Sequence, residues 1–207
     1  MTIHWPGDDE DKPAPPPLRR VQALVNTVER PDGADRLAEA ADARSWLVDN
    51  ELLGPRAEVT AADLKLVREV REALRALLVH NAGGPAPTRD TLAALRRITA
   101  PVTPAVGEDG SVALVTDRGD VVSRLAELLV VVRDAQRDGS WARLKACGND
   151  ECRWAFYDAS RNRGGTWCDM ATCGNKLKNR EFRARRRAAP PISSDATPTR
   201  PPRRRAR

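Results

Sequence analysis

No stretch of this sequence contains the roughly 18 consecutive apolar residues that a membrane-spanning helix needs. The first residues, "MTIHWPGDDEDKPAPPP", also lack the basic start and the apolar centre of a secretory signal. Hydrophobic residues make up 41% of the chain and charged residues 31%, which is typical of soluble globular proteins. We therefore expect a cytoplasmic protein outside the membrane, in which the four cysteines stay reduced.

Motifs of catalysis are also missing. The sequence has no Gly-rich phosphate-binding loop, no nucleophile motif and only two histidines. His4 lies in the Pro-rich amino terminus, and His80 lies near the end of a predicted helix, where a histidine is more often a cap or dipole partner than a ligand. The acidic residues before position 140 are spread over predicted helix surfaces, as on solvated faces. These absences predict that the protein is not an enzyme.

Negative charge is scarce at the carboxyl end of the chain. Residues 174–207 contain twelve Lys and Arg against two Asp and Glu, a net +10, whereas the whole chain carries +6. Residues 1–173 therefore carry −4, since +6 less +10 is −4. Such asymmetry favours a polyanion as the partner of the carboxyl end, although a basic tail can also serve only to keep a protein soluble.

The residues before position 140 predict a mostly helical α+β domain with a small β-hairpin. Helical apolar spacing occurs in four segments, namely 18–29, the residues after Asp42, 88–99 and 121–137. The strongest helix begins at the cap Thr60, with Asp63 at the capping-box position, and ends near residues 80–82. The β-branched runs on both sides of "GEDG" in "TPAVGEDGSVALVTD" predict the hairpin.

The four cysteines form two pairs with the same spacing, Cys147-x4-Cys152 and Cys168-x4-Cys173. Two pairs separated by about fifteen residues are typical of a structural site in which four thiolates surround one Zn²⁺. Four protein ligands leave no open position for water, so we expect the zinc to stabilise structure and not to catalyse. The alternatives are an iron–sulfur cluster, whose common spacings differ, and disulfides, which need an oxidising compartment.

Six of the eight aromatic residues lie near these cysteines, namely Trp141, Trp154, Phe156, Tyr157, Trp167 and Phe182. A module this small needs large side chains and a metal to form a core, so we expect these residues in a core more than in base stacking. Both cysteine pairs also include the tripeptide Cys-Gly-Asn, at 147–149 and 173–175. Because Gly and Asn tolerate positive φ, we expect them to turn backbone amides towards the thiolates.

A basic helix is predicted directly after the second cysteine pair, over "NKLKNREFRARRR". Four of its cations, at steps of four, three and four, share one face: Lys176, Arg180, Arg183 and Arg187. Three more widen this basic stripe: Lys178, Arg185 and Arg186. Such a helix can contact a nucleic-acid groove or phosphates, but charge alone does not distinguish DNA from RNA.

These residues resemble a known family. The segment "RLKACGNDECRWAFYDASRNRGGTWCDMATCGNKLKNREFRARR" is similar to the CGNR zinc finger of bacterial proteins, and "ALVNTVERPDGADRLAEAADARSWLVDNELL" resembles the start of the ABATE domain that precedes it. One difference is that the name-giving motif ends here in Lys176 instead of Arg, which keeps the charge but loses bidentate binding. The resemblance implies one structural zinc held by the four cysteines, DNA binding by the finger, and a stress-linked transcription regulator.

Together the patterns predict four segments: a disordered acidic and Pro-rich tail (1–17), an ABATE-like α+β domain (18–139), a zinc finger with its basic helix (140–187) and a disordered basic tail (188–207). We expect the two folded segments to have separate cores. The first hypothesis is a zinc-dependent, DNA-binding transcription regulator whose upstream domain senses a small-molecule effector or mediates self-association. The alternative is a zinc-stabilised module that binds RNA or an acidic protein surface and has no DNA operator.

Overall fold

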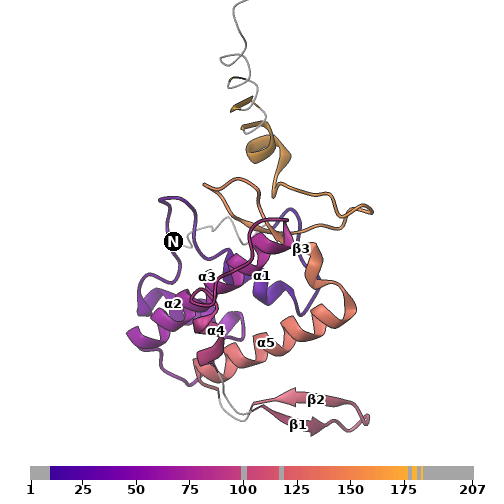
Figure 1. Cartoon of the computed structure of the whole chain (residues 1–207). Coiled ribbons are helices and arrows are strands. Elements are labelled where there is room, and N and C mark those ends of the chain that lie inside the picture. The colour runs from indigo at the N-terminus through magenta and orange to yellow at the C-terminus, as the bar shows by residue number, and fades with distance from the viewer. Residues whose placement is uncertain (1–9, 99–101, 117–118, 177–178, 181–182, 184–207) are drawn as a thin grey trace, which may run out of the picture.

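The computed structural model describes residues 10–98, 102–116, 119–176, 179–180 and 183 (Figure 1). Its upstream part contains helices α1 (Arg19–Val25), α2 (Ala40–Asp49), α3 (Ala61–Asn81), α4 (Ala93–Arg97) and α5 (Val121–Asp138), and strands β1 (Thr103–Val106) and β2 (Val112–Val115). Then follow a 3-10 turn η2 (Trp141–Arg143), strands β3 (Leu144–Ala146) and β4 (Ala155–Tyr157), and a π-helical turn η3 (Met170–Gly174). The predicted fold class, a mostly helical region with a hairpin followed by a small four-cysteine module, is confirmed.

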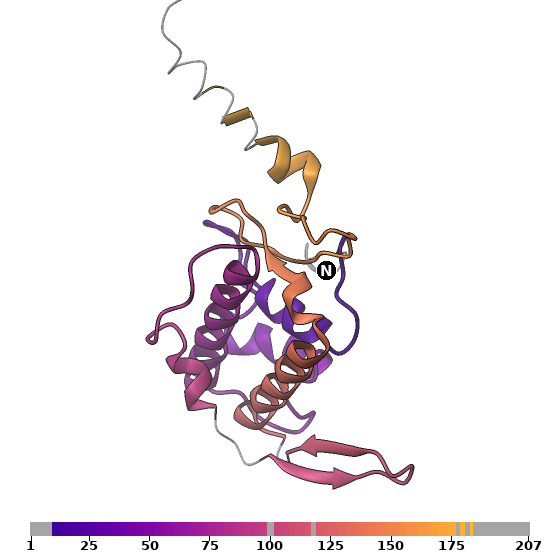
Figure 2. The same cartoon turned by 45° about the vertical axis from the view of Figure 1, so that its right-hand side comes forward.

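Two long helices, α3 and α5, contact each other and both contact α1 (Figure 2). Helix α3 begins with the predicted capping box, because Asp63 N donates to Thr60 Oγ1 at 3.1 Å and Thr60 N donates to Asp63 Oδ2 at 2.9 Å. Helix α5 ends at Asp138, directly before Gly139, whose φ of 80° is the left-handed conformation that suits glycine. Local sequence signals therefore determine the ends of both long helices.

Two predicted helices are shorter than their apolar spacing suggested. Helix α1 ends at Val25 instead of residue 29, because the next two side chains bond to backbone groups: Asn26 to Ala155, and Thr27 to Leu24 O. Helix α4 starts at Ala93 instead of residue 88, since Thr88 and its neighbours form turns in which Thr91 N donates to the Thr88 hydroxyl. Short polar side chains that bond the local backbone compete with helix formation at both places.

The hairpin pairs β1 with β2 in antiparallel register, from Thr103 opposite Val115 to Val106 opposite Val112. It lies at the end of the molecule opposite the cysteine module in both views (Figures 1 and 2). Val106 and Val112 are 74% and 69% exposed, so this hairpin adds little to the core.

One continuous hydrophobic core includes both the upstream helices and the cysteine module. Buried Leu24, Leu74 and Leu125 belong to the same cluster as Trp141 and Leu144. The expectation of two separate cores is therefore wrong. Strand β3 packs directly on α3, which gives the small module the apolar partner that it cannot supply itself.

The outer edge of β4 is paired with the side chain of Asn26, the residue directly after α1. Ala146 of β3 and Ala155 of β4 are opposite each other. The next pair, Cys147 and Trp154, is hydrogen-bonded through Cys147 N and Trp154 O. Because hydrogen-bonded and non-hydrogen-bonded pairs alternate in an antiparallel ladder, Ala146 and Ala155 are a non-hydrogen-bonded pair. The N–H and C=O of Ala155 therefore face away from β3. Asn26 bonds with both: its Oδ1 accepts from Ala155 N at 2.7 Å, and its Nδ2 donates to Ala155 O at 2.9 Å.

Residues 10–17, expected to be disordered, pack against the same edge. Lys12 O accepts from Tyr157 N at 2.9 Å, Ala14 N donates to Gln22 Oε1 at 2.6 Å, and Ala14 is 1% exposed. The expectation of disorder is therefore wrong for residues 10–17. A Pro-rich composition does not reveal that the buried side chain of Gln22 bonds to the backbone of this segment. Residues 1–9 and the predicted disordered tail 188–207 lie outside the described residues. None of the described helices is long and apolar enough to cross a membrane.

Candidate metal centre

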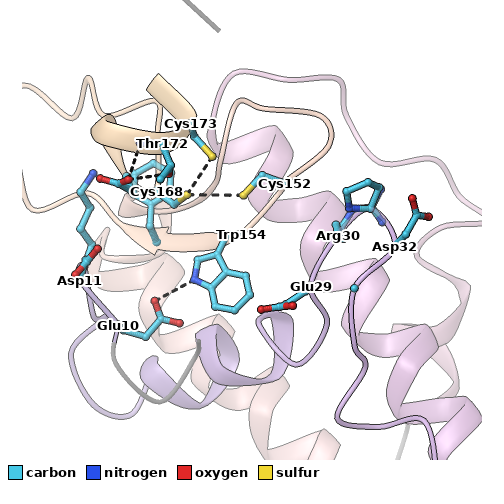
Figure 3. Close-up of a pocket in the computed structure, with 15 residues that line it drawn as sticks. Glu10, Asp11, Glu29, Arg30, Asp32, Cys152, Trp154, Cys168, Thr172 and Cys173 are labelled. Carbon is cyan, nitrogen blue, oxygen red and sulfur yellow. Dashed lines mark hydrogen bonds between the residues drawn. The ribbon is translucent and has the colours of Figure 1, made fainter. Parts of the chain in front are cut away.

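The four cysteines meet at one point although the chain brings them from three different places. Cys147 follows β3, Cys152 precedes β4, and the other two flank the start of η3. All four Sγ atoms lie within 4.8 Å of one another. The Sγ of Cys168 is 3.8 Å from those of Cys152 and Cys173, and the three face one another in Figure 3.

These distances and donor atoms fit zinc. Zn–S bonds of about 2.3 Å in a tetrahedron place neighbouring sulfur atoms about 3.8 Å apart. Hydrogen bonds with Cys152 and Cys168 lower the pKa of Cys147 to about 2, and the bond with Cys147 raises the pKa of Cys152 to about 12. Four thiols this close cannot all lose their protons without a cation between them, and a bound Zn²⁺ supplies that charge.

The first cysteine pair is organised by Asn149. Its carbonyl accepts from Cys152 N at 2.9 Å, and its Oδ1 accepts from Glu151 N at 3.2 Å. Its Nδ2 lies 3.8 Å from Cys173 Sγ and donates to that sulfur. The buried amide thus forms the turn between two cysteines and also stabilises charge on a third.

The two Cys-Gly-Asn glycines serve a different purpose from the one predicted. Neither Gly148 nor Gly174 has a positive φ. Instead, both lie against neighbouring side chains: a Cβ on Gly148 would be 2.9 Å from both Trp167 Cζ3 and Thr166 Cγ2, and one on Gly174 would be 2.3 Å from Met170 Sδ and 3.1 Å from Trp167 Cδ1. The expectation about positive φ is therefore wrong, and glycine suits both positions because Trp167 and its neighbours leave little room for a Cβ atom.

The second cysteine pair is organised by Asp169, which begins the turn η3. Its carboxylate accepts from Ala171 N at 3.1 Å, from Thr172 N at 2.8 Å and from the Thr172 hydroxyl at 2.7 Å. The Thr172 hydroxyl and these backbone amides lower the pKa of Asp169. The capped turn carries Cys173 and leads directly into the residues predicted as a basic helix.

The aromatic residues divide between core and surface. Trp141 and Phe156 are 7% and 1% exposed, and Trp154, Tyr157 and Trp167 are half-buried. The core role expected for this group is thus clearest for Trp141 and Phe156. Phe182 lies outside the described residues.

The predicted nucleic-acid residues are only partly described. Residues 175–176, 179–180 and 183 are helical, and Lys176, Arg180 and Arg183 are exposed on them. Lys176 Nζ lies 3.3 Å from Glu151 Oε2, an exposed ion pair that water screens. Arg180 and Arg183 form no ion pair with any described residue. The other four predicted contacts, Lys178, Arg185, Arg186 and Arg187, lie outside the described residues.

A buried ion pair in the finger had no signal in the sequence. Lys145 Nζ donates to Asp158 Oδ2 at 2.8 Å, with the two side chains only 8% and 4% exposed. Asp158 also accepts from Ser160 N and Gly165 N, which fixes the loop between them. Burial alone would raise the pKa of Asp158, but these donors hold it well below its usual range. Sequence reasoning treats such charges as surface residues, because pairing in the interior depends on the fold.

A four-cysteine cluster of this geometry, joined to a helical domain, defines a zinc-finger protein. Residues 143–186 match the model of the CGNR zinc finger, and residues 18–137 match the model of the ABATE family, "Putative stress-induced transcription regulator". The chain belongs to the ABATE family and carries a CGNR zinc finger after the ABATE domain. No curated protein matches the chain. This family membership and the sulfur cluster agree with the predicted cofactor, one Zn²⁺.

Proposed function

We propose that the protein is a zinc-dependent transcription regulator that binds DNA through its finger. In this proposal Cys147, Cys152, Cys168 and Cys173 are the ligands of one structural Zn²⁺. The finger occupies residues 140–187 and the ABATE domain residues 18–139, and the protein acts in the cytoplasm without catalysing a reaction. Membership of a family of transcription regulators supports the regulatory role.

The observation that carries DNA binding is the exposed basic face directly after the zinc cluster. Lys176, Arg180 and Arg183 follow one another at steps of four and three, so they share one side of a helix. Cys173, one of the four clustered thiols, lies only three residues before Lys176, so zinc binding fixes the start of this face. We assign the remaining contacts to the same stripe, at Lys178, Arg185, Arg186 and Arg187.

The shared core gives the upstream domain a direct mechanical link to the finger. Asn26, directly after α1, bonds to the backbone of Ala155 in β4, and Arg75 Nη1 of α3 donates to Arg153 O, two residues before β4, at 3.1 Å. A change in the upstream domain therefore reaches the zinc cluster through fixed contacts. This link supports a role for the ABATE domain as sensor or as self-association unit.

The dependence of binding on salt tests the proposal. Each phosphate contact contributes about 0.9 to the slope of log affinity against log salt on duplex DNA. Replacing Lys176, Arg180 and Arg183 together by Ala should lower that slope by about 3 and weaken binding to a random-sequence duplex. Fluorescence anisotropy at several salt concentrations measures both quantities.

Two controls separate the helix from charge in general. Arg56→Ala removes an exposed arginine near α5's start, at the end of the molecule away from the finger, and should leave the slope unchanged. Deletion of residues 190–207 removes every cation of the basic tail but leaves the predicted helix in place. If this deletion abolishes binding while the triple variant binds like the unmodified chain, the tail and not the helix contacts DNA, and the proposal is wrong.

A further inference from the structure

A cavity of about 550 Å³ lies where three parts of the chain meet beside the zinc cluster (Figure 3). Its walls are residues 10–12, the loop of residues 29–33, and the finger, including Trp154, Phe156 and three of the four cysteines. Small-molecule sites usually have volumes of about 300 to 1,000 Å³ and lie at junctions between structural units. The volume of this cavity and its place between three parts of the chain are therefore typical of a small-molecule site.

The loop that forms one wall is held rigidly. Val28 and Asp35 form an antiparallel bridge at its base, and Glu29 N donates to Ala34 O at 3.0 Å. Asp35 also receives two bonds from the buried guanidinium of Arg71, at 2.7 and 2.9 Å. The backbone that carries Glu29 and Asp32 is thus fixed in place before any ligand arrives, which lowers the entropic cost of binding.

The wall of residues 10–12 is tied to the finger. Glu10 accepts from Asn26 Nδ2 at 2.5 Å and from Trp154 Nε1 at 3.2 Å. Lys12 donates to Trp167 O at 2.7 Å and lies 5.1 Å from the centre of the Phe156 ring. Lys12 is therefore already occupied, and one aromatic ring of the cavity already binds a cation.

The charges on the walls decide which ligands fit. Five carboxylates line the cavity, namely Glu10, Asp11, Glu29, Asp32 and Asp169, against the two cations Lys12 and Arg30. Four thiolates outweigh one Zn²⁺, so the neighbouring zinc cluster adds further negative charge. Phosphates and carboxylates are repelled by such a surface, which separates this cavity from any contact with nucleic acid.

The Trp154 indole lies in the middle of this negative surface. Figure 3 shows Glu10 at its Nε1 edge and Glu29 on the other side of the ring. Glu29 is half-buried, and its carboxylate has no hydrogen bond or ion pair with any described residue. Among the described residues no cation lies over the Trp154 ring. An aromatic face beside an unpaired carboxylate is the combination that binds ammonium and guanidinium groups.

We propose that this cavity binds a small organic cation, whose ammonium or guanidinium group pairs with Glu29 and whose apolar part lies against Trp154. Such a ligand contacts both the ABATE domain and the residues around the zinc cluster. Its binding is independent of whether the finger contacts DNA, so the test below uses no nucleic acid.

Three probes of the same size and different charge test the proposal: 2-phenylethylammonium, neutral 2-phenylethanol and anionic 3-phenylpropionate. Each is titrated by calorimetry into the zinc-loaded full chain. We expect saturable binding of the cation at a single site, and affinities for the other two probes at least about tenfold weaker. Equal binding of all three, or no saturable binding of the cation at millimolar concentration, would show that the cavity is not a cation site.

Two single-residue variants test whether the bound cation lies next to Glu29. Glu29→Gln keeps the shape of the loop and should weaken cation binding about tenfold or more, the effect of losing one charge-assisted bond. Glu108→Gln makes the same change on the tip of the exposed hairpin and should have no effect. Equal effects of both variants would contradict the assignment. If deletion of residues 188–207 strengthens cation binding tenfold, the chain's own basic tail occupies the cavity and the small-molecule proposal is wrong.

Discussion

Replacing Asn26 by Leu tests whether the ABATE domain and the finger fold as one unit. Asn26 is 1% exposed and bonds to both backbone groups of Ala155. Leucine has a similar shape and can bond to neither. Ala155 O keeps the bond from Gln22 Nε2 at 3.2 Å, but Ala155 N–H loses its partner on the outer edge of β4. The substitution thus removes one defined contact between the two parts.

A buried N–H without an acceptor costs about 1 to 3 kcal/mol. The variant also loses the bond from Asn26 Nδ2 to Glu10. We therefore expect a loss of about 2 to 3 kcal/mol in the free energy of unfolding. That is a large fraction of the roughly 5 to 15 kcal/mol typical of a domain.

Urea unfolding measures this change, followed by far-ultraviolet circular dichroism for the helices and by tryptophan fluorescence. Because the core is continuous, both signals should move to lower urea together, in a single transition. The matched control is Asn162→Leu on an exposed loop of the finger, which should change stability by less than about 0.5 kcal/mol. A loss no greater than that of the control, or a shift in only one of the two signals, would refute the shared unit.

Three further predictions follow from the finger. Cys168→Ser should reduce zinc, measured by mass spectrometry, from one equivalent to none, and should also lower the melting temperature of the upstream helices; an unchanged zinc content would contradict the four-thiolate site. Gly148→Ala should cost about 1 to 3 kcal/mol in urea unfolding because its new methyl group meets Trp167, whereas Gly164→Ala, where no atom lies within 4 Å, should be nearly neutral. The lowered pKa of Asp158 means that its contribution to stability is present above about pH 4, the unfolded value, and is lost as the pH falls further. Asp158→Asn should flatten this part of the acid unfolding curve, and an unchanged curve would show that the ion pair with Lys145 contributes nothing.

Elements with a local signal could be predicted from the sequence. The capping box at Thr60, the glycine at 139 and the "GEDG" turn each act within a few residues, so α3, α5 and the hairpin lie where the sequence placed them. The cysteine cluster belongs to the same group, because two equally spaced pairs restrict the geometry strongly.

Features that depend on distant segments could not be predicted. The bonds between Asn26 and Ala155 join residues 129 positions apart; they coincide with the early end of α1 and tie that end to β4. The packing that favours glycine at positions 148 and 174 also has no signal in the sequence, because Trp167 lies against both positions only in the folded chain. The order of residues 10–14 depends likewise on buried Gln22 and on the edge of β4.

Selection from mixed pools of nucleic acid is the most direct test of the proposal that the finger reads DNA. The zinc-loaded chain is offered random duplexes and random RNAs, and the bound molecules are sequenced. If the finger reads DNA, one duplex sequence should be enriched. This enrichment should disappear when Lys176, Arg180 and Arg183 are replaced by Ala and persist in the Arg56→Ala control. Enrichment of RNA alone, or recovery of duplexes with no common sequence, would contradict it.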